Sequence, residues 1–168
     1  PQSWLTSLYG VLMYAPTTAL ALWGPAFIST TYNLSTLEAA SINSVMFIGW
    51  CVGCPLFGKF SDKIKRRKVP LYISSVGTFI TLMMLVYLPI TSPLALSILL
   101  FCFGFFTCGF VPSFSIIREL HPAEASGTAL GFMNMINNIG GAVAPVMVGV
   151  ILDYVWTGQL DSTGTRIY

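Results

Sequence analysis

The stretch GKFSDKIKRRK, residues 58–68, decides how the rest of the chain is arranged. It contains six of the eight Lys and Arg residues of the chain and lies between two long apolar segments. Lys and Arg beside a membrane-spanning segment are retained on the cytoplasmic side during insertion. The stretch therefore predicts a cytoplasmic loop over residues 59–68 and fixes the orientation of every neighbouring segment.

The composition is that of a membrane protein. Of the 168 residues, 8% are charged and 55% are hydrophobic, whereas about 25% of a soluble domain is charged. So few ionic side chains cannot cover a water-facing surface. The basic residues form one short cluster without an aromatic platform between them, so no nucleic-acid partner is expected.

Five apolar segments are long enough to cross a hydrocarbon core, which takes about 20 helical residues. We therefore predict an all-α fold, a polytopic bundle of five transmembrane helices with seven of the eight Lys and Arg on one side. Pro16 leaves open whether the first helix is bent or broken, and the fourth, rich in Phe, is expected to form lipid-facing and packing surface. The segments lie at about 4–28, 39–58, 69–88, 94–117 and 127–152, and a polar external tail follows at 153–168.

Amide side chains occur inside two of these segments. Asn43 lies on one helical face with Trp50, while Asn134, Asn137 and Asn138 lie between glycines of the fifth segment. Amides near the middle of a membrane are costly against lipid, so they must face protein or water. An interhelical hydrogen-bond clamp and a contact with substrate both remain open.

The cysteines offer a hypothesis of another class. Cys51 and Cys54 form a CxxC pattern, and His121 is the one histidine, so an intramembrane thiol or redox enzyme is an alternative. Because an apolar segment disfavours the reactive thiolate, we expect packing cysteines instead. With a single His, a usual zinc site lacks ligands. We therefore expect no metal, no cofactor and no catalytic residue.

The charged stretch also has a motif within it. It resembles the loop motif of the major facilitator superfamily, in which a glycine is followed by an acid, an adjacent basic residue and a closing Arg-Arg. The matching residues are Gly58, Asp62, Lys63, Arg66 and Arg67. Lys65 stands where the family usually has a second glycine, so the turn is expected to be less tight.

Three further stretches extend the resemblance over nearly the whole chain. Residues 23–25 (WGP), 49–50 (GW) and 127–134 (GTALGFMN) are similar to the second half of a twelve-helix transporter of that family. The resemblance implies helices seven to eleven, with the N-terminal half and helix twelve missing. Placement as helices one to five remains an alternative, because residues 141–149 also resemble a glycine-proline motif of the fifth helix. Within the family, the sequence resembles the phagosomal nutrient transporters of intracellular bacteria.

The resemblance implies a function. It is secondary active transport of a small polar solute, an amino acid or nucleoside, by alternating access in a bacterial inner membrane. Symport for nutrient uptake is expected, with the coupling carboxylate in the missing half. The loop residues named above would control conformational change, whereas a non-transporting membrane scaffold is a further alternative. The residues expected to contact substrate are Tyr14, Asn43, Trp50, Asn134 and Asn138.

Overall fold

The computed structural model describes residues 2–88, 90 and 92–156, and each regular element within them is a helix. Five segments are long and apolar enough to cross a membrane, because α4, η1 and α5 together make one segment, Pro93–Leu120. The predicted all-α bundle of five transmembrane helices is therefore confirmed. The elements are α1 (Gln2–Tyr32), α2 (Thr36–Ile64), α3 (Lys68–Tyr87), α4 (Pro93–Thr107), the 3-10 turn η1 (Cys108–Phe110), α5 (Val111–Leu120) and α6 (Ala123–Val155).

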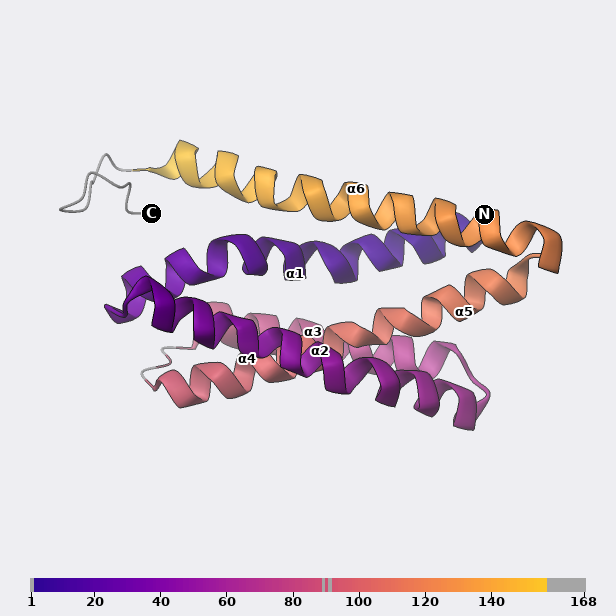
Figure 1. The fold of residues 1–168 in the computed structure, drawn as a ribbon, viewed down its shortest axis with the longest axis horizontal. Coiled ribbons are helices and arrows are strands. Elements are labelled where there is room, and N and C mark those ends of the chain that lie inside the picture. Colours follow the sequence, from indigo (N-terminus) through magenta and orange to yellow (C-terminus); the bar gives the residue numbers. More distant parts are fainter. Residues whose placement is uncertain (1, 89, 91, 157–168) are drawn as a thin grey trace.

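The helices form two packed groups, visible in Figure 1. α6 lies along α1 over most of its length, while α2, α3 and α4 pack together below them. α1 and α6 run in the same direction, since Gly10 meets Asn137 and, further along both helices, Trp23 meets Gly149. α5 diverges from the direction of α4 and carries the chain back to α6 (Figure 1).

Glycines allow α2 and α4 to touch through their backbones. A Cβ on Gly104 would lie 2.0 Å from the carbonyl oxygen of Met46, and a Cβ on Gly49 would lie 2.2 Å from that of Phe101. No side chain fits at either position. Such contacts give membrane helices the dispersion energy that replaces the hydrophobic effect between them.

The fourth segment is the most enclosed of the five. The side chain of Phe103 is completely buried, and Phe105 packs against Phe57 with ring centroids 5.5 Å apart. The phenylalanines of this segment therefore act more in packing than in contact with lipid. α1 is continuous through Pro16, so the structure shows no break in that helix.

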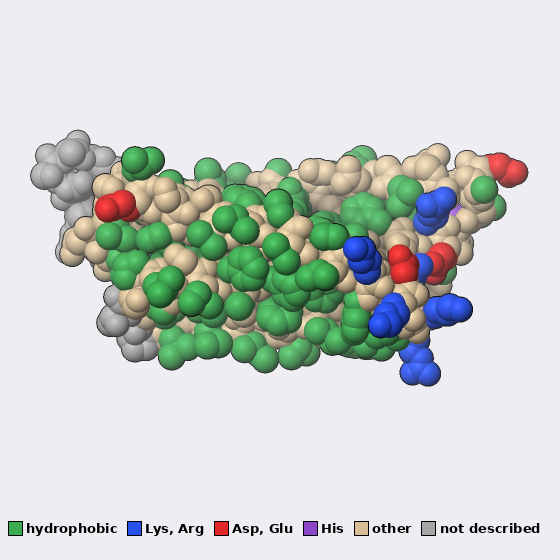
Figure 2. Space-filling model, turned by 60° about the horizontal axis from the view of Figure 1, so that its bottom comes forward, with side chains coloured by type: hydrophobic (Ala, Val, Ile, Leu, Met, Phe, Trp, Pro, Cys, Tyr) green, Lys and Arg blue, Asp and Glu red, His purple; other side chains and the backbone are tan. Residues whose placement is uncertain are grey.

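One end of the bundle carries the seven Lys and Arg residues of the described part of the chain (Figure 2), and Arg166 lies outside that part. α2 ends, α3 begins and α5 ends there, so the loop at 59–68 and Arg118 are neighbours in space. Figure 2 shows the Lys and Arg side chains gathered at that end, beyond a broad hydrophobic middle. The asymmetry predicted from the sequence is thus present in three dimensions among the described residues.

Candidate functional site

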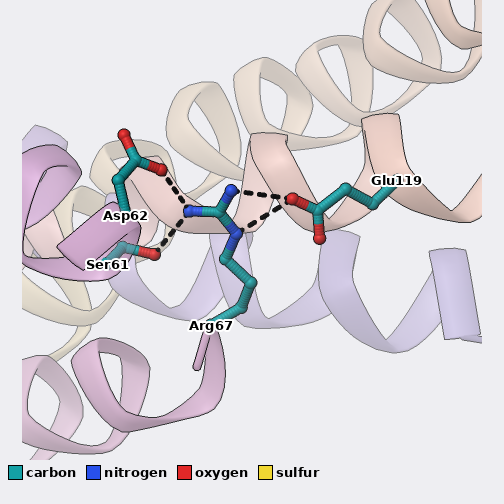
Figure 3. A network of polar contacts seen from close by, with 4 residues as sticks. All are labelled: Ser61, Asp62, Arg67 and Glu119. Carbon is teal, nitrogen blue, oxygen red and sulfur yellow. Dashed lines mark hydrogen bonds and ion pairs between the residues drawn. The ribbon is translucent and has the colours of Figure 1, made fainter. Parts of the chain in front are cut away.

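Arg67 is the centre of a polar network at the charged end (Figure 3). Its Nη1 donates to Asp62 Oδ1 at 2.5 Å and to Ser61 Oγ at 2.9 Å, both on the last turns of α2. Its Nε and Nη2 donate to Glu119 Oε1 on α5, at 3.0 and 2.7 Å. One guanidinium therefore connects the end of α2, the start of α3 and the end of α5.

The electrostatics of the network follow from this geometry. Hydrogen bonds to Glu119, and then to Asp62, raise the pKa of Arg67 further above its ordinary value. The Arg67 side chain is 25% exposed, whereas those of Asp62 and Glu119 are 70% and 55% exposed. Water therefore screens these ion pairs, and the network is suited to form and break at a modest energy.

The other predicted loop residues have different surroundings. Gly58 lies inside α2, and a Cβ added there would meet no atom within 4 Å. Lys63 and Arg66 are exposed, and within the described part of the chain no ion pair involves them. Lys65 adopts the left-handed conformation with φ 54° and ψ 23°, which is the conformation that glycine takes at helix ends.

Tyr14 and Trp50 are brought together in an aromatic cluster with Phe110. The Tyr14 and Trp50 ring centroids are 6.1 Å apart, and Phe110 lies 6.3 and 5.6 Å from them. Trp50 Nε1 donates to Thr107 Oγ1 at 2.8 Å, and the Tyr14 ring also packs against Gly141 of α6. The cluster therefore joins α1, α2, η1 and α6, and all three rings remain partly exposed.

Asn134 and Asn138 form a second pair, on the exposed side of α6. Asn138 Nδ2 donates to the Asn134 carbonyl oxygen at 2.8 Å and to Asn134 Oδ1 at 3.2 Å. Both residues are exposed. Asn138 Oδ1 accepts no hydrogen bond from any described group, so polar capacity remains on this surface.

Asn43 and Asn137 are instead buried between helices, each 3% exposed. Asn43 Nδ2 donates to the Leu20 carbonyl oxygen at 3.2 Å and packs on Gly24, which is the geometry of a clamp between α2 and α1. Asn137 packs on Gly10 of α1, and neither of its amide atoms has a partner among the described residues. Sequence reasoning noted Asn137 but did not place it between α1 and α6.

A cavity among the described residues lies apart from the aromatic cluster and from the Asn134–Asn138 pair. It has a volume of about 430 Å³ and lies on the side of Asn43 away from the charged end. Its walls are almost entirely aliphatic or aromatic, which is unsuited to a polar solute. They include Pro16, Leu20, Trp23, Asn43, Leu100 and Val148.

The residues of the thiol-enzyme hypothesis do not come together. His121 Nε2 and Ser3 Oγ are hydrogen-bonded at 3.0 Å, at the charged end. Cys54 contacts Cys108 of η1, whereas Cys51 is exposed. Within residues 2–88, 90 and 92–156 no group of three His, Cys, Asp or Glu side chains could hold a metal ion.

Several contacts of the candidate residues were not identified from the sequence. Glu119, Thr107 and Phe110 are more than 50 residues away from the side chains they contact. Glu119 alone carried a usable signal, because it is an acid on the same side as the basic loop. Nothing in the sequence indicated the contacts of Phe110 and Thr107 with Trp50.

Comparison with known proteins gives a consistent result. The family model of the Major Facilitator Superfamily matches residues 1–145. The lysosomal dipeptide transporter MFSD1 of Mus musculus is 31% identical over 130 residues, which are 77% of this chain and 27% of that protein. The membrane sensor protein UhpC of Salmonella typhimurium is 28% identical over 164 residues, or 94% of this chain and 37% of that protein. This chain thus spans about a third of the length of such relatives, and no solved structure matches it.

Proposed function

The chain belongs to the major facilitator superfamily, and from this premise we propose that it forms helices seven to eleven of a secondary transporter. Its partner is the N-terminal half, and the two halves move against each other in alternating access. The family model and the five apolar helices support this proposal. The 59–68 loop would lie in the cytoplasm, because it carries the concentration of Lys and Arg.

We propose that the solute is small and polar, an amino acid, a dipeptide or a nucleoside. The relative in Mus musculus is named a dipeptide transporter, and the resemblance to nutrient transporters favours amino acids or nucleosides. The polar groups in the spans are amides and hydroxyls, with no charged residue from Val69 to Ile117. Recognition by this half would therefore use hydrogen bonds and ring stacking, and a carboxylate for symport would lie in the other half.

Within this half, the single observation that carries the site is the aromatic cluster beside α6. Tyr14 contacts Trp50 and packs on Gly141, one turn from Asn138. The amide pair of Asn134 and Asn138 is exposed and has spare hydrogen-bonding capacity. We propose that these four side chains line the substrate pathway, and that Asn43 acts as the clamp between α1 and α2.

The loop residues have a separate role in this proposal. Arg67, Asp62 and Glu119 would hold α2, α3 and α5 in one arrangement on the cytoplasmic side. Because the ion pairs are partly exposed, they can break when the transporter changes conformation. Bacterial inner membrane and nutrient uptake remain the proposed setting for this activity.

Uptake by cells that express the full-length protein tests the pathway. Radiolabelled dipeptides, amino acids and nucleosides are supplied to wild type and to Asn134→Ala and Asn138→Ala. We expect uptake of one class, reduced at least tenfold in both variants at normal expression. Ile139→Ala is the matched control, since it removes an exposed side chain from a neighbouring face of the same helix. Equal uptake in all variants would exclude the amides from the pathway.

A further inference from the structure

The Cys54 and Cys108 thiols meet between α2 and η1. Cys54 Sγ donates a hydrogen bond to Cys108 Sγ at a distance of 3.0 Å, across 54 positions of sequence. The Cys108 thiol also contacts the carbonyl oxygens of Trp50 and Gly104 at 3.3 and 3.4 Å. Both cysteines are free thiols, Cys108 buried and Cys54 partly buried.

The backbone brings these thiols together. A Cβ on Gly53 would lie 2.7 Å from the carbonyl oxygen of Phe105 and 3.1 Å from Cys108 Sγ. α2 and the end of α4 are therefore in direct backbone contact beside the pair. Because a cysteine side chain is short, such a close approach is what a disulfide between helices requires. The two sulfur atoms need to move by about 1 Å to reach bonding distance.

The remaining two cysteines do not share this arrangement. Cys51 is exposed, and Cys102 lies on α4 with its side chain half-buried. In the described part of the chain neither has a hydrogen bond to another cysteine. The two thiols in contact are therefore not those of the CxxC pattern in the sequence but a pair that the fold brings together.

We propose that Cys54 and Cys108 form an oxidisable pair, a modification site for a diffusible two-electron oxidant such as hydrogen peroxide. The two thiols give up two protons and two electrons, a sulfur–sulfur bond forms, and the peroxide is reduced to two waters. The oxygen–oxygen bond of the peroxide breaks in this step. The product joins α2 covalently to the 3-10 turn at which the fourth segment changes direction.

The disulfide would lie at η1, the turn between α4 and α5. η1 separates α4 from α5, and α5 carries Glu119 to the Arg67 network. A disulfide at Cys108 fixes this turn against α2 and limits movement of α5. Oxidation should therefore stabilise the conformation in which the Arg67 network is formed. This modification site does not depend on which solute is transported.

The test uses the full-length protein in membranes, treated with hydrogen peroxide, and then denatured and labelled with a maleimide. We expect two of the four thiols of this chain to become protected, and mass spectrometry of the digest to find Cys54 linked to Cys108. Dithiothreitol should restore labelling. The oxidised protein should also melt at a higher temperature than the reduced protein.

Matched variants decide the result. Cys51→Ser and Cys102→Ser should retain the linked peptide, whereas Cys54→Ser and Cys108→Ser should lose it. Melting of each reduced variant shows whether it is folded. A Cys51–Cys54 link in its place would overturn the proposal. Oxidation of Cys51 in wild type, while Cys54 and Cys108 remain labelled, would also overturn it. The peroxide would then have reached α2 without forming the disulfide between Cys54 and Cys108.

Discussion

Replacing Arg67 by Gln tests the network most directly. The change removes two ion pairs and the hydrogen bond to Ser61 while keeping a long polar side chain. An exposed ion pair contributes about 0.2–1 kcal/mol, and the acids here are 70% and 55% exposed. We therefore expect Arg67→Gln to destabilise this conformation by about 1–2 kcal/mol in total.

That energy is large for the proposed transporter, which would have to alternate between conformations of similar stability. A difference of 1–2 kcal/mol is a factor of about 5–30 in the ratio of two states. If the network exists in only one state, the uptake rate should fall when that state becomes too rare to complete the cycle. Asp62→Asn and Glu119→Gln should each have a smaller effect in the same direction, with near-normal expression. The uptake rate of cells that express each full-length variant measures these effects.

Two comparisons isolate the network from other effects. Arg66→Gln removes the same charge from the neighbouring residue, which is exposed and outside the network, so its uptake should stay close to wild type. The double variant of Arg67→Gln with Glu119→Gln should lose less uptake, in free-energy terms, than the two single variants lose together. Equal losses in Arg66→Gln and Arg67→Gln, or additive losses in the double variant, would refute the reasoning and make net charge the cause.

Three further outcomes are expected from thermal melting or uptake. Lys65→Gly should be more stable than Lys65→Ala by about 1 kcal/mol, because both remove the charge but only glycine relieves the left-handed backbone; equal melting would contradict this. Gly104→Ala should lower stability by about 1–3 kcal/mol, because its Cβ would collide with a backbone carbonyl. Gly131→Ala is the control, since its Cβ meets no atom within 4 Å, and a similar loss in both would be the contrary result. Trp50→Phe should reduce uptake more than Thr107→Val does, since the first removes the indole ring and the second only its hydrogen-bond partner; the reverse order would assign the role to the hydroxyl.

The fold could be predicted largely from the sequence, because apolar length and the position of positive charge determine it. The ends of the helices could not. α2 continues to Ile64, and α6 begins at Ala123, both beyond the apolar segments. Hydropathy marks where a segment leaves lipid, whereas a helix continues into water as long as its own hydrogen bonds are satisfied.

The site was harder to predict, for a physical reason. On a soluble helix the buried face is apolar and the exposed face is polar, but on a membrane helix both lipid and protein accept apolar side chains. The three amides at positions 134, 137 and 138 therefore did not reveal which of them faces α1. In the structure Asn137 is buried there, and its two neighbours are exposed.

The exposed side of α6 itself contains two different stripes. One carries Gly127, Gly131, Asn134 and Asn138, and the other is aliphatic, with Met135, Ile139 and Val143 about half exposed. Lipid accepts the aliphatic stripe at no cost, but each exposed amide in hydrocarbon costs several kcal/mol, on the order of 2–7. The stripe of glycines and amides must therefore face water or protein in the membrane. We expect the aliphatic stripe beside it to face lipid, and this rotation of α6 would turn Asn134 and Asn138 toward the proposed pathway.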